Sequence, residues 1–373
     1  MSVQGEEQLH AANCKYCEDS SNKDESGRPH RVVKKNCDRE LPRKPTSVFS
    51  SRFVEKQREL EAHIAVATNN VLCRMTRKDF LQLLVALSAM GTLSSFKKIT
   101  DELPVQGSTM PVLFTSHGNP MDIVRSTDER PLWRALNELG STLKSQYEIK
   151  AVLVVSAHWC TQGTFVNISP EQKQVYDYYG FPDEYYKVQY HAHGSPEIAH
   201  EVKHIIPAIT ETTDWGLDHG AWPMLMHLFP KADVPVFQLS LDYYADPHYH
   251  YELGKQLRSL RDRGVLIIGS GALVHNLRLA MRRMMSGDNT LYGWEPEYDA
   301  WIKKQIEERN IDNIINYETS HPLGKLAAPT PDHFVPVLYS LGLMDRGEDL
   351  NFFYDHNAEL PAFSERSFLI GKV

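Results

Sequence analysis

The sequence predicts an α/β fold, with a single three-layer α/β/α domain and a mostly parallel central sheet over residues 105–373. One observation is that short apolar runs alternate with longer amphipathic stretches from Met110 onward, the pattern of strands and helices that follow one another along the chain. Another is that several of the apolar runs end in a polar turn that carries a histidine. No internal repeat appears. We therefore expect one sheet covered by helices on both faces.

The predicted elements follow from the apolar pattern and from the Gly and Pro residues that interrupt it. Pro235 lies near the start of one strand, where the missing N–H is tolerated. The predicted strands are Val112–Thr115, Ala151–Ser156, Val234–Leu239 and Val265–Gly269. The predicted helices are Pro131–Gln146, Ser195–Ile206, His219–Leu228, Pro247–Arg263, Leu273–Met285, Glu295–Glu308 and His333–Leu341.

Two segments precede this domain. Residues 1–74 are rich in charged and small polar residues, and such a composition buries too little apolar surface to offset the entropy of ordering. We predict a disordered N-terminal extension there. In residues 75–104, Arg77 and Lys78 precede a short apolar stretch, which resembles a degenerate twin-arginine export signal. An amphipathic helix packed on the domain is the alternative, and the sequence does not decide between them.

Composition limits the possible functions. The 42% hydrophobic and 24% charged residues are normal for a soluble globular protein. The net charge of −8 argues against a nucleic-acid or anionic-membrane surface, because both need a positive field. The stretch after Met75 is too short to be a typical membrane span. Five cysteines without an even framework suit a reducing cytosol, so we expect a cytoplasmic protein, or an exported one if translation starts at Met75.

Four histidines lie at the ends of apolar runs or in compact loops: His117, His158, His275 and His333. The ends of strands in open α/β sheets are where ligands bind, and neutral imidazole is the commonest metal ligand. His117 and His158 lie about forty residues apart, enough for a crossover helix between adjacent parallel strands. We therefore predict that these two rings meet and that the protein is a metalloenzyme.

Three of the candidate histidines lie near predicted helix starts. Asp218 could cap the helix beginning near His219 or orient the His219 ring as part of an acid–base pair. His275 is expected in the first turn of a helix. Asp332 could cap the next helix or hold the His333 ring.

Other histidines and motifs point to no separate site. We expect His321 to be structural, and His200 and His204 to form a solvated helix face. The chain contains no Walker phosphate loop, no dinucleotide-binding glycine fingerprint and no Gly-x-Ser-x-Gly nucleophile elbow.

Six ordered segments resemble the class III extradiol ring-cleaving dioxygenases, specifically the DOPA 4,5-dioxygenase type. The resemblance covers the chain from about residue 108 to the C-terminus. The segments are 110–121 (MPVLFTSHGNPM), 154–159 (VVSAHW), 180–186 (GFPDEYY), 216–222 (GLDHGAW), 269–277 (GSGALVHNL) and 329–334 (PTPDHF).

The resemblance implies one divalent metal at His117 and His158, with His333 and His275 completing or flanking the site. Fe(II) is required for oxygen chemistry, and zinc is also described in the family. His219 and His275 are the implied acid–base residues. The usual non-haem iron pattern of two histidines and one carboxylate is absent, because His333 stands in the place of the carboxylate.

The implied reaction is insertion of O2 beside the diol of a catechol such as DOPA, which gives a ring-opened semialdehyde. Two other classes remain open. One is a zinc hydrolase in which the same histidines activate water, and the other is a binding protein that has lost its metal. The particular catechol, the ligand or base role of His275 and the oligomeric state stay undecided.

Overall fold

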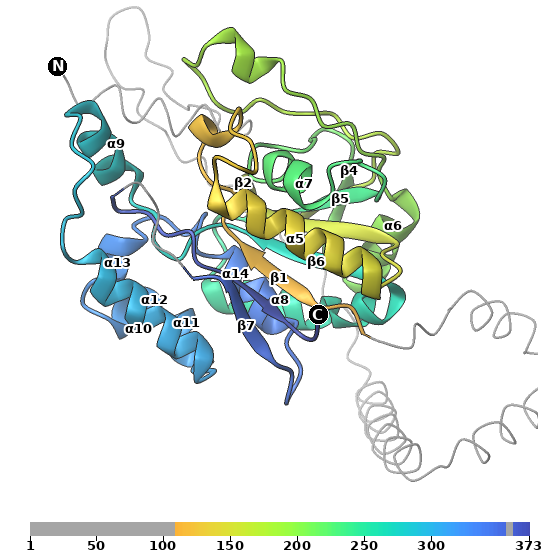
Figure 1. The fold of residues 1–373 in the computed structure, drawn as a ribbon. Coiled ribbons are helices and arrows are strands. Elements are labelled where there is room, and N and C mark those ends of the chain that lie inside the picture. Colours follow the sequence, from red (N-terminus) through yellow and green to blue (C-terminus); the bar gives the residue numbers. More distant parts are fainter. Residues whose placement is uncertain (1–108, 356–360) are drawn as a thin grey trace, which may run out of the picture. The chain divides into compact units, whose positions relative to one another are not determined.

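The computed structural model describes residues 109–355 and 361–373 (Figure 1). These residues form one eight-stranded sheet with the strand order β4-β3-β5-β2-β6-β1-β8-β7. The strands are β1 (Val112–Thr115), β2 (Ala151–Thr161), β3 (Phe165–Asn167), β4 (Thr210–Thr212), β5 (Val236–Asp242), β6 (Val265–Ser270), β7 (Leu350–Tyr354) and β8 (Ser367–Ile370). The four inner strands β5, β2, β6 and β1 are parallel, and β3 and β8 join them antiparallel. The mostly parallel α/β sheet predicted from the sequence is confirmed.

The helices comprise α-helices and three 3-10 turns. The α-helices are α5 (Pro131–Gln146), α6 (Pro196–Ile205), α7 (Trp222–Leu228), α8 (Pro247–Gln256), α9 (Leu277–Met285), α10 (Glu295–Glu307), α11 (Ile311–Ile315), α12 (Tyr317–Ser320), α13 (Gly324–Ala327) and α14 (Pro336–Gly342). The 3-10 turns are η1 (Pro120–Asp122), η2 (Asp183–Tyr186) and η3 (Leu257–Arg263). Among the described residues, no helix combines the length and apolar character needed to cross a bilayer.

Helices cover both faces of the sheet, which makes the three layers. Along β2, Val152 and Val154 pack with α5 and α7, whereas Leu153 and Val155 pack with α8, η3 and α14. Figure 1 shows α5 crossing one face of the sheet, with α8 and α14 behind it. A strand buried on both faces needs an unbroken apolar run, and this explains why β2 was visible in the sequence.

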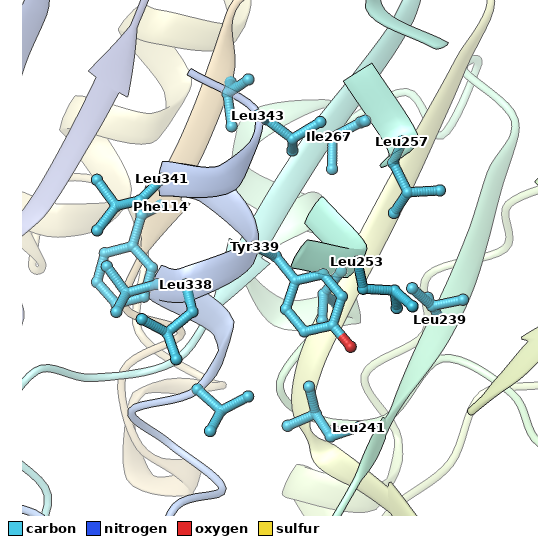
Figure 2. Packing of buried hydrophobic residues seen from close by; sticks show 14 of the residues in the cluster. Phe114, Leu239, Leu241, Leu253, Leu257, Ile267, Leu338, Tyr339, Leu341 and Leu343 are labelled. Carbon is cyan, nitrogen blue, oxygen red and sulfur yellow. The ribbon is translucent and has the colours of Figure 1, made fainter. Parts of the chain in front are cut away.

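Close contact between α8 and α14 anchors the C-terminal part of the domain (Figure 2). Leu338 and Tyr339 of α14 pack in the same buried cluster as Leu253 of α8. Glycine allows this approach, because a Cβ on Gly342 would lie 2.3 Å from the carbonyl oxygen of Tyr251. The buried helix α14 follows directly after the loop that carries one of the candidate histidines, so its packing holds that loop.

Three helices begin later than predicted, and this changes where the histidines lie. The helix expected from His219 begins at Trp222, and the helix expected from His333 begins at Pro336. A proline lies in the first turn of each, where its missing N–H costs nothing. The helix expected from Leu273 begins after Asn276, whose side chain caps it. His219, His275 and His333 therefore lie in loops, and the prediction that His275 is in a helical turn was wrong.

The prediction that β1 and β2 are neighbours was also wrong, because β6 pairs with both and lies between them. The sequence reading also missed the short strands β3, β4, β7 and β8, which lie towards the two edges of the sheet and lack long apolar runs. The predicted extension 1–74 and the segment 75–104 lie outside the described residues.

One buried histidine that is not among the candidate site residues predicts acid sensitivity. The ring of His227 stacks on Trp133 with centroids 4.6 Å apart, and burial lowers the pKa of His227 to about 4. The unfolded chain takes up this proton at its ordinary pKa near 6.5. Between pH 6.5 and 4 the unfolded state therefore binds more protons, and the free energy of unfolding falls with falling pH by up to about 3 kcal/mol from this residue.

His227→Phe removes the titration and keeps an aromatic ring against Trp133. Urea unfolding at several pH values should show a shallower loss of stability below pH 6.5 in the variant than in the wild type. Part of the slope should remain, because burial also lowers the pKa of His250 to about 4. Parallel pH profiles for the two proteins would contradict this assignment.

Candidate metal centre

His117 is held at the end of β1 by a turn and by a hydroxyl group. Gly118 follows it with a φ of 69°, a left-handed conformation that glycine adopts without strain. Nδ1 of His117 lies 3.0 Å from Oγ of Ser270, at the end of β6. The Ser270 hydroxyl donates its single proton to the carbonyl oxygen of Gly220, so Nδ1–H of His117 must donate to Ser270. Nε2 of His117 therefore carries a free lone pair.

His158 reaches the same point from β2. The pairing of β2 with β5 shifts register between Val155 and Cys160, and such irregularities redirect side chains. Nδ1 of His158 lies 3.3 Å from the carboxylate of Asp177, and its Nε2 lies 3.1 Å from Nε2 of His117. His117 and His158 therefore do meet, but His158 lies inside β2, which runs to Thr161 and does not end at Ser156 as predicted. They reach across β6, whose last residue is a small serine.

His333 completes the group from the loop before α14. Its carbonyl oxygen accepts a hydrogen bond from the Ala272 N–H at 2.8 Å, which ties this loop to the segment after β6. Its Nδ1 hydrogen bonds with the carboxylate of Asp332. Asp332 thus holds the His333 ring, which was one of the two roles predicted for it. One nitrogen from each of His117, His158 and His333 lies within 4.8 Å of the others.

The donor set of these three histidines suits one divalent metal ion. Carboxylate and hydroxyl partners engage Nδ1 in every case, so Nε2 is the atom left to bind a ligand. The Nε2 atoms of His117 and His158 lie 3.1 Å apart in a buried site, so a proton or a metal cation must lie between them. Two imidazole nitrogens each about 2.0–2.1 Å from one metal would lie about 2.8–3.4 Å apart at bond angles of roughly 90–110°. The spacing of His117 and His158 falls in that range.

His219 lies beside this group, and Asp177 holds it. Oδ1 of Asp177 accepts the backbone N–H of His219 at 2.8 Å, and Oδ2 lies 2.8 Å from Nδ1 of the ring. The centroids of the His219 and His158 rings are 3.7 Å apart. Sequence reasoning missed Asp177, although it lies three residues before the Gly180-Phe181-Pro182 segment that carried part of the family resemblance.

Asp218 has neither of the roles predicted for it. It is fully buried and accepts hydrogen bonds from the side chains of Ser156, Trp215 and Gln238 at 2.6 to 3.0 Å. The helix cap lies at Ala221, and it is Asp177 that contacts the His219 ring. Asp218 therefore fastens the 215–220 loop to β2 and β5.

His275 lies on the opposite side of the group. Its ring stacks on His333 with centroids 3.5 Å apart and planes 6° from parallel. Its backbone N–H donates to the carbonyl oxygen of Ala327 at 2.8 Å, which fixes the loop. A nitrogen of His275 shares a second group with His333 and Asp332, all within 4.8 Å of one another. The structure thus gathers all five predicted site histidines, with donor atoms of His117, His158 and His333 in one group and His275 in another that includes His333 and Asp332.

Burial keeps most of these imidazoles neutral. It lowers the pKa of His117 and His275 well below the ordinary value, assisted by the other histidines, and it also lowers the pKa of His219 and His333. Burial acts on His158 in the same direction, but hydrogen bonding and charge from Asp177 outweigh it and raise the pKa of His158. Neutral imidazole is the form that binds a metal, so four of the five rings are ready to do so. At His158 the raised pKa means that a proton competes more strongly with the metal than at the other rings.

Comparison with known proteins agrees with this arrangement. Residues 111–363 match the family model described as the catalytic LigB subunit of aromatic ring-opening dioxygenase. The match spans more than half of the chain and includes every histidine of the site. The chain belongs to the LigB family of class III extradiol dioxygenases.

Several similar proteins are named for an activity. The chain is 33% identical over 282 residues to a protein named 4,5-DOPA dioxygenase extradiol from Escherichia coli K12, covering 73% of this chain and 99% of that protein. A protein of the same name from Beta vulgaris is 36% identical over 234 residues, covering 61% of this chain and 85% of that protein. The crystal structure of the uncharacterized protein JW3007 from Escherichia coli K12 matches with a TM-score of 0.58 and 32% identity, covering 70% of this chain and all of that one.

His321, His200 and His204 are not members of this group of histidines. His321 packs against Trp301 with centroids 4.9 Å apart, and its Nδ1 accepts the Leu323 N–H, as expected of a structural residue. His200 and His204 lie exposed on α6, as predicted for a solvated face.

Gly220 offers a steric test of the site. A Cβ there would lie 2.3 Å from Oγ of Ser156 and 2.8 Å from Cδ2 of His158. Gly220→Ala is expected to displace the His158 ring, weaken metal binding and cost about 1–3 kcal/mol of stability through overpacking. Zinc titration of the metal-free protein, together with urea unfolding, measures both effects.

Gly342→Ala is the matched control, because its Cβ would also lie 2.3 Å from a neighbouring atom, but between α8 and α14. It should lower stability and leave the metal affinity of the folded protein unchanged. Equal metal affinities for Gly220→Ala and Gly342→Ala would contradict the placement of His158 in the metal centre.

Proposed function

We propose that the protein is an iron-dependent dioxygenase that opens the ring of a catechol, with DOPA as the first candidate substrate. Both atoms of one O2 would enter the product, and the ring carbon–carbon bond beside the diol would break to give a semialdehyde. The observation that carries this proposal is the convergence of three imidazoles whose donor nitrogens lie within 4.8 Å of one another, with two further histidines against them, in a LigB-family chain. Relatives named 4,5-DOPA dioxygenase extradiol support the choice of substrate.

His117, His158 and His333 would hold the metal. A bound Fe(II) would supply the redox chemistry that allows O2 to react with a catechol, whereas zinc is redox-inert and would not. The protein prepares this site before any ligand binds, because Ser270, Asp177 and Asp332 face Nδ1 of the three rings as acceptors and so leave Nε2 facing inward.

His219 and His275 would move the protons of the reaction. They flank opposite members of the trio, with His219 against His158 and His275 against His333. Both are neutral near pH 7, because burial lowers the pKa of each, so each can accept a proton from a catechol hydroxyl. The histidine that gains this proton could later return it to an oxygen atom of the reacting group. A general acid–base residue of this kind contributes about 10²–10⁴-fold to rate.

The test is anaerobic reconstitution with Fe(II), followed by oxygen uptake with a panel of catechols and detection of a yellow ring-opened product. We expect uptake coupled to product with the iron form, and neither with the zinc form or with His158→Ala. Metal binding without oxygen uptake on any catechol would overturn the proposal and favour a zinc hydrolase built on the same histidines.

A further inference from the structure

Two of the three candidate ligands sit in the same kind of local arrangement. On one side, Asp177 lies 3.3 Å from Nδ1 of His158 and 2.8 Å from Nδ1 of His219. On the other side, Asp332 hydrogen bonds with Nδ1 of His333, and His275 lies in the same group within 4.8 Å. Each unit therefore contains one candidate ligand, one carboxylate and one further histidine.

The ring contacts repeat in the same way. The centroids of His158 and His219 are 3.7 Å apart, and those of His275 and His333 are 3.5 Å apart. His117 contacts a ring of each unit and has a hydroxyl partner instead of a carboxylate. The two carboxylates come from unrelated parts of the chain, one from the loop after β3 and the other from the loop before α14.

The charge of a bound metal ion explains why carboxylates lie beside these ligands. Non-haem iron sites commonly use two histidines and one carboxylate, and the carboxylate offsets part of the metal charge. The trio of His117, His158 and His333 contains no carboxylate. Negative charge comes instead from Asp177 and Asp332, which contact the ligands His158 and His333. A carboxylate that accepts Nδ1–H makes the opposite nitrogen a stronger donor and fixes the tautomer.

We propose that Asp177 and Asp332 are paired positioning residues, each of which orients one metal ligand through its Nδ1, and that Asp177 also orients the His219 ring. Metal affinity then depends on both carboxylates, and proton transfer by His219 depends on Asp177. This inference rests on the ligand set of the proposed function but not on the identity of the substrate.

Replacement of either aspartate by asparagine removes the negative charge and keeps the shape of the side chain. In Asp177→Asn, the amide oxygen can still accept the backbone N–H of His219. The NH₂ group then faces Nδ1 of the His158 and His219 rings. That contact requires Nδ1 to accept, which places the ring proton on Nε2 and blocks the ligand position. In serine proteases the same exchange beside a catalytic histidine leaves the geometry intact and lowers turnover because the tautomer is wrong.

The experiment is titration of the metal-free proteins with Zn(II), followed by calorimetry. We expect Asp177→Asn and Asp332→Asn each to bind zinc about 10–100-fold more weakly than the wild type. Glu171→Gln is the matched control, because Glu171 makes the same kind of contact with Nδ1 of His193 at 2.8 Å on the surface. It should bind zinc as the wild type does. Wild-type affinity in both Asp variants would overturn the proposal.

Two further measurements keep the inference testable if an Asp variant does not fold. Nitrogen NMR of the zinc-loaded wild type should show Nδ1–H on His158 and His333, and a zinc bond at Nδ1 of either ring would contradict the assignment. His219→Gln and His275→Gln should keep the zinc affinity of the wild type and, in the iron form, lose turnover. If the iron form of the wild type consumes no oxygen with any catechol, the proposed function fails, while the zinc and NMR results still decide this inference.

Discussion

His117→Ala is expected to abolish metal binding and ring cleavage together. His117 packs against both other candidate ligands, is 3% exposed, and has its Nε2 3.1 Å from that of His158. Without it, two imidazoles remain, too few for the three-histidine pattern of protein metal sites with an open position. Metal content after dialysis and oxygen uptake with catechols measure the two losses.

His200→Ala is the control for this experiment, because His200 lies exposed on α6 and contacts only a surface carboxylate, that of Glu211, at 2.8 Å. It should keep both metal and activity. One equivalent of metal retained by His117→Ala would show that the ligand set is wrong, whereas loss of activity with metal retained would assign His117 to substrate binding.

Arg130→Met is expected to lower the free energy of unfolding by about 3–5 kcal/mol, because it removes a buried guanidinium that pairs with two buried carboxylates. The Arg130 guanidinium forms ion pairs with Asp122 and Glu365, and all three side chains are at most 2% exposed. Asp122 also accepts hydrogen bonds from the backbone and side chain of Asn119, in the turn that follows His117. Urea unfolding of the metal-free protein measures the loss of stability.

A surface pair provides the comparison. Lys144 and Asp233 form an ion pair in which the side chains are 37% and 47% exposed, so Lys144→Met should cost less than about 1 kcal/mol. Adding Asp122→Asn to Arg130→Met should recover part of the stability, because it removes one uncompensated charge. Equal costs for Arg130→Met and Lys144→Met would show that the buried network does not stabilise the domain.

The sequence alone predicted the central part of this fold well. The runs that form β1, β2, β5 and β6 are apolar because both faces of these strands are covered, and α5 was predicted with its exact bounds. The sequence also predicted all five histidines of the site. Burial on both faces and histidines at strand ends are local properties, and local sequence records them directly.

Helix starts were harder, although their signals were present. Asn276, Pro223 and Pro336 mark the beginnings of α9, α7 and α14, but the apolar pattern continues upstream of each and suggested longer helices. The upstream residues are apolar because they are buried in loops, and burial alone does not distinguish a loop from a helix. This error placed His275 on a helix, when its role depends on a loop stacked against His333.

The tertiary structure decided how the site is assembled. Strand order follows from the free energy of packing the whole sheet, so no local pattern reveals that β6 separates β1 from β2. Asp177 contacts His158 and His219, residues distant from it in the chain, and nothing in its own segment marks it as their partner. The sequence thus determined which chemical groups are available, because residue type and burial are local. Only the folded chain determined which groups touch, because contacts between distant segments depend on the packing of all the elements together.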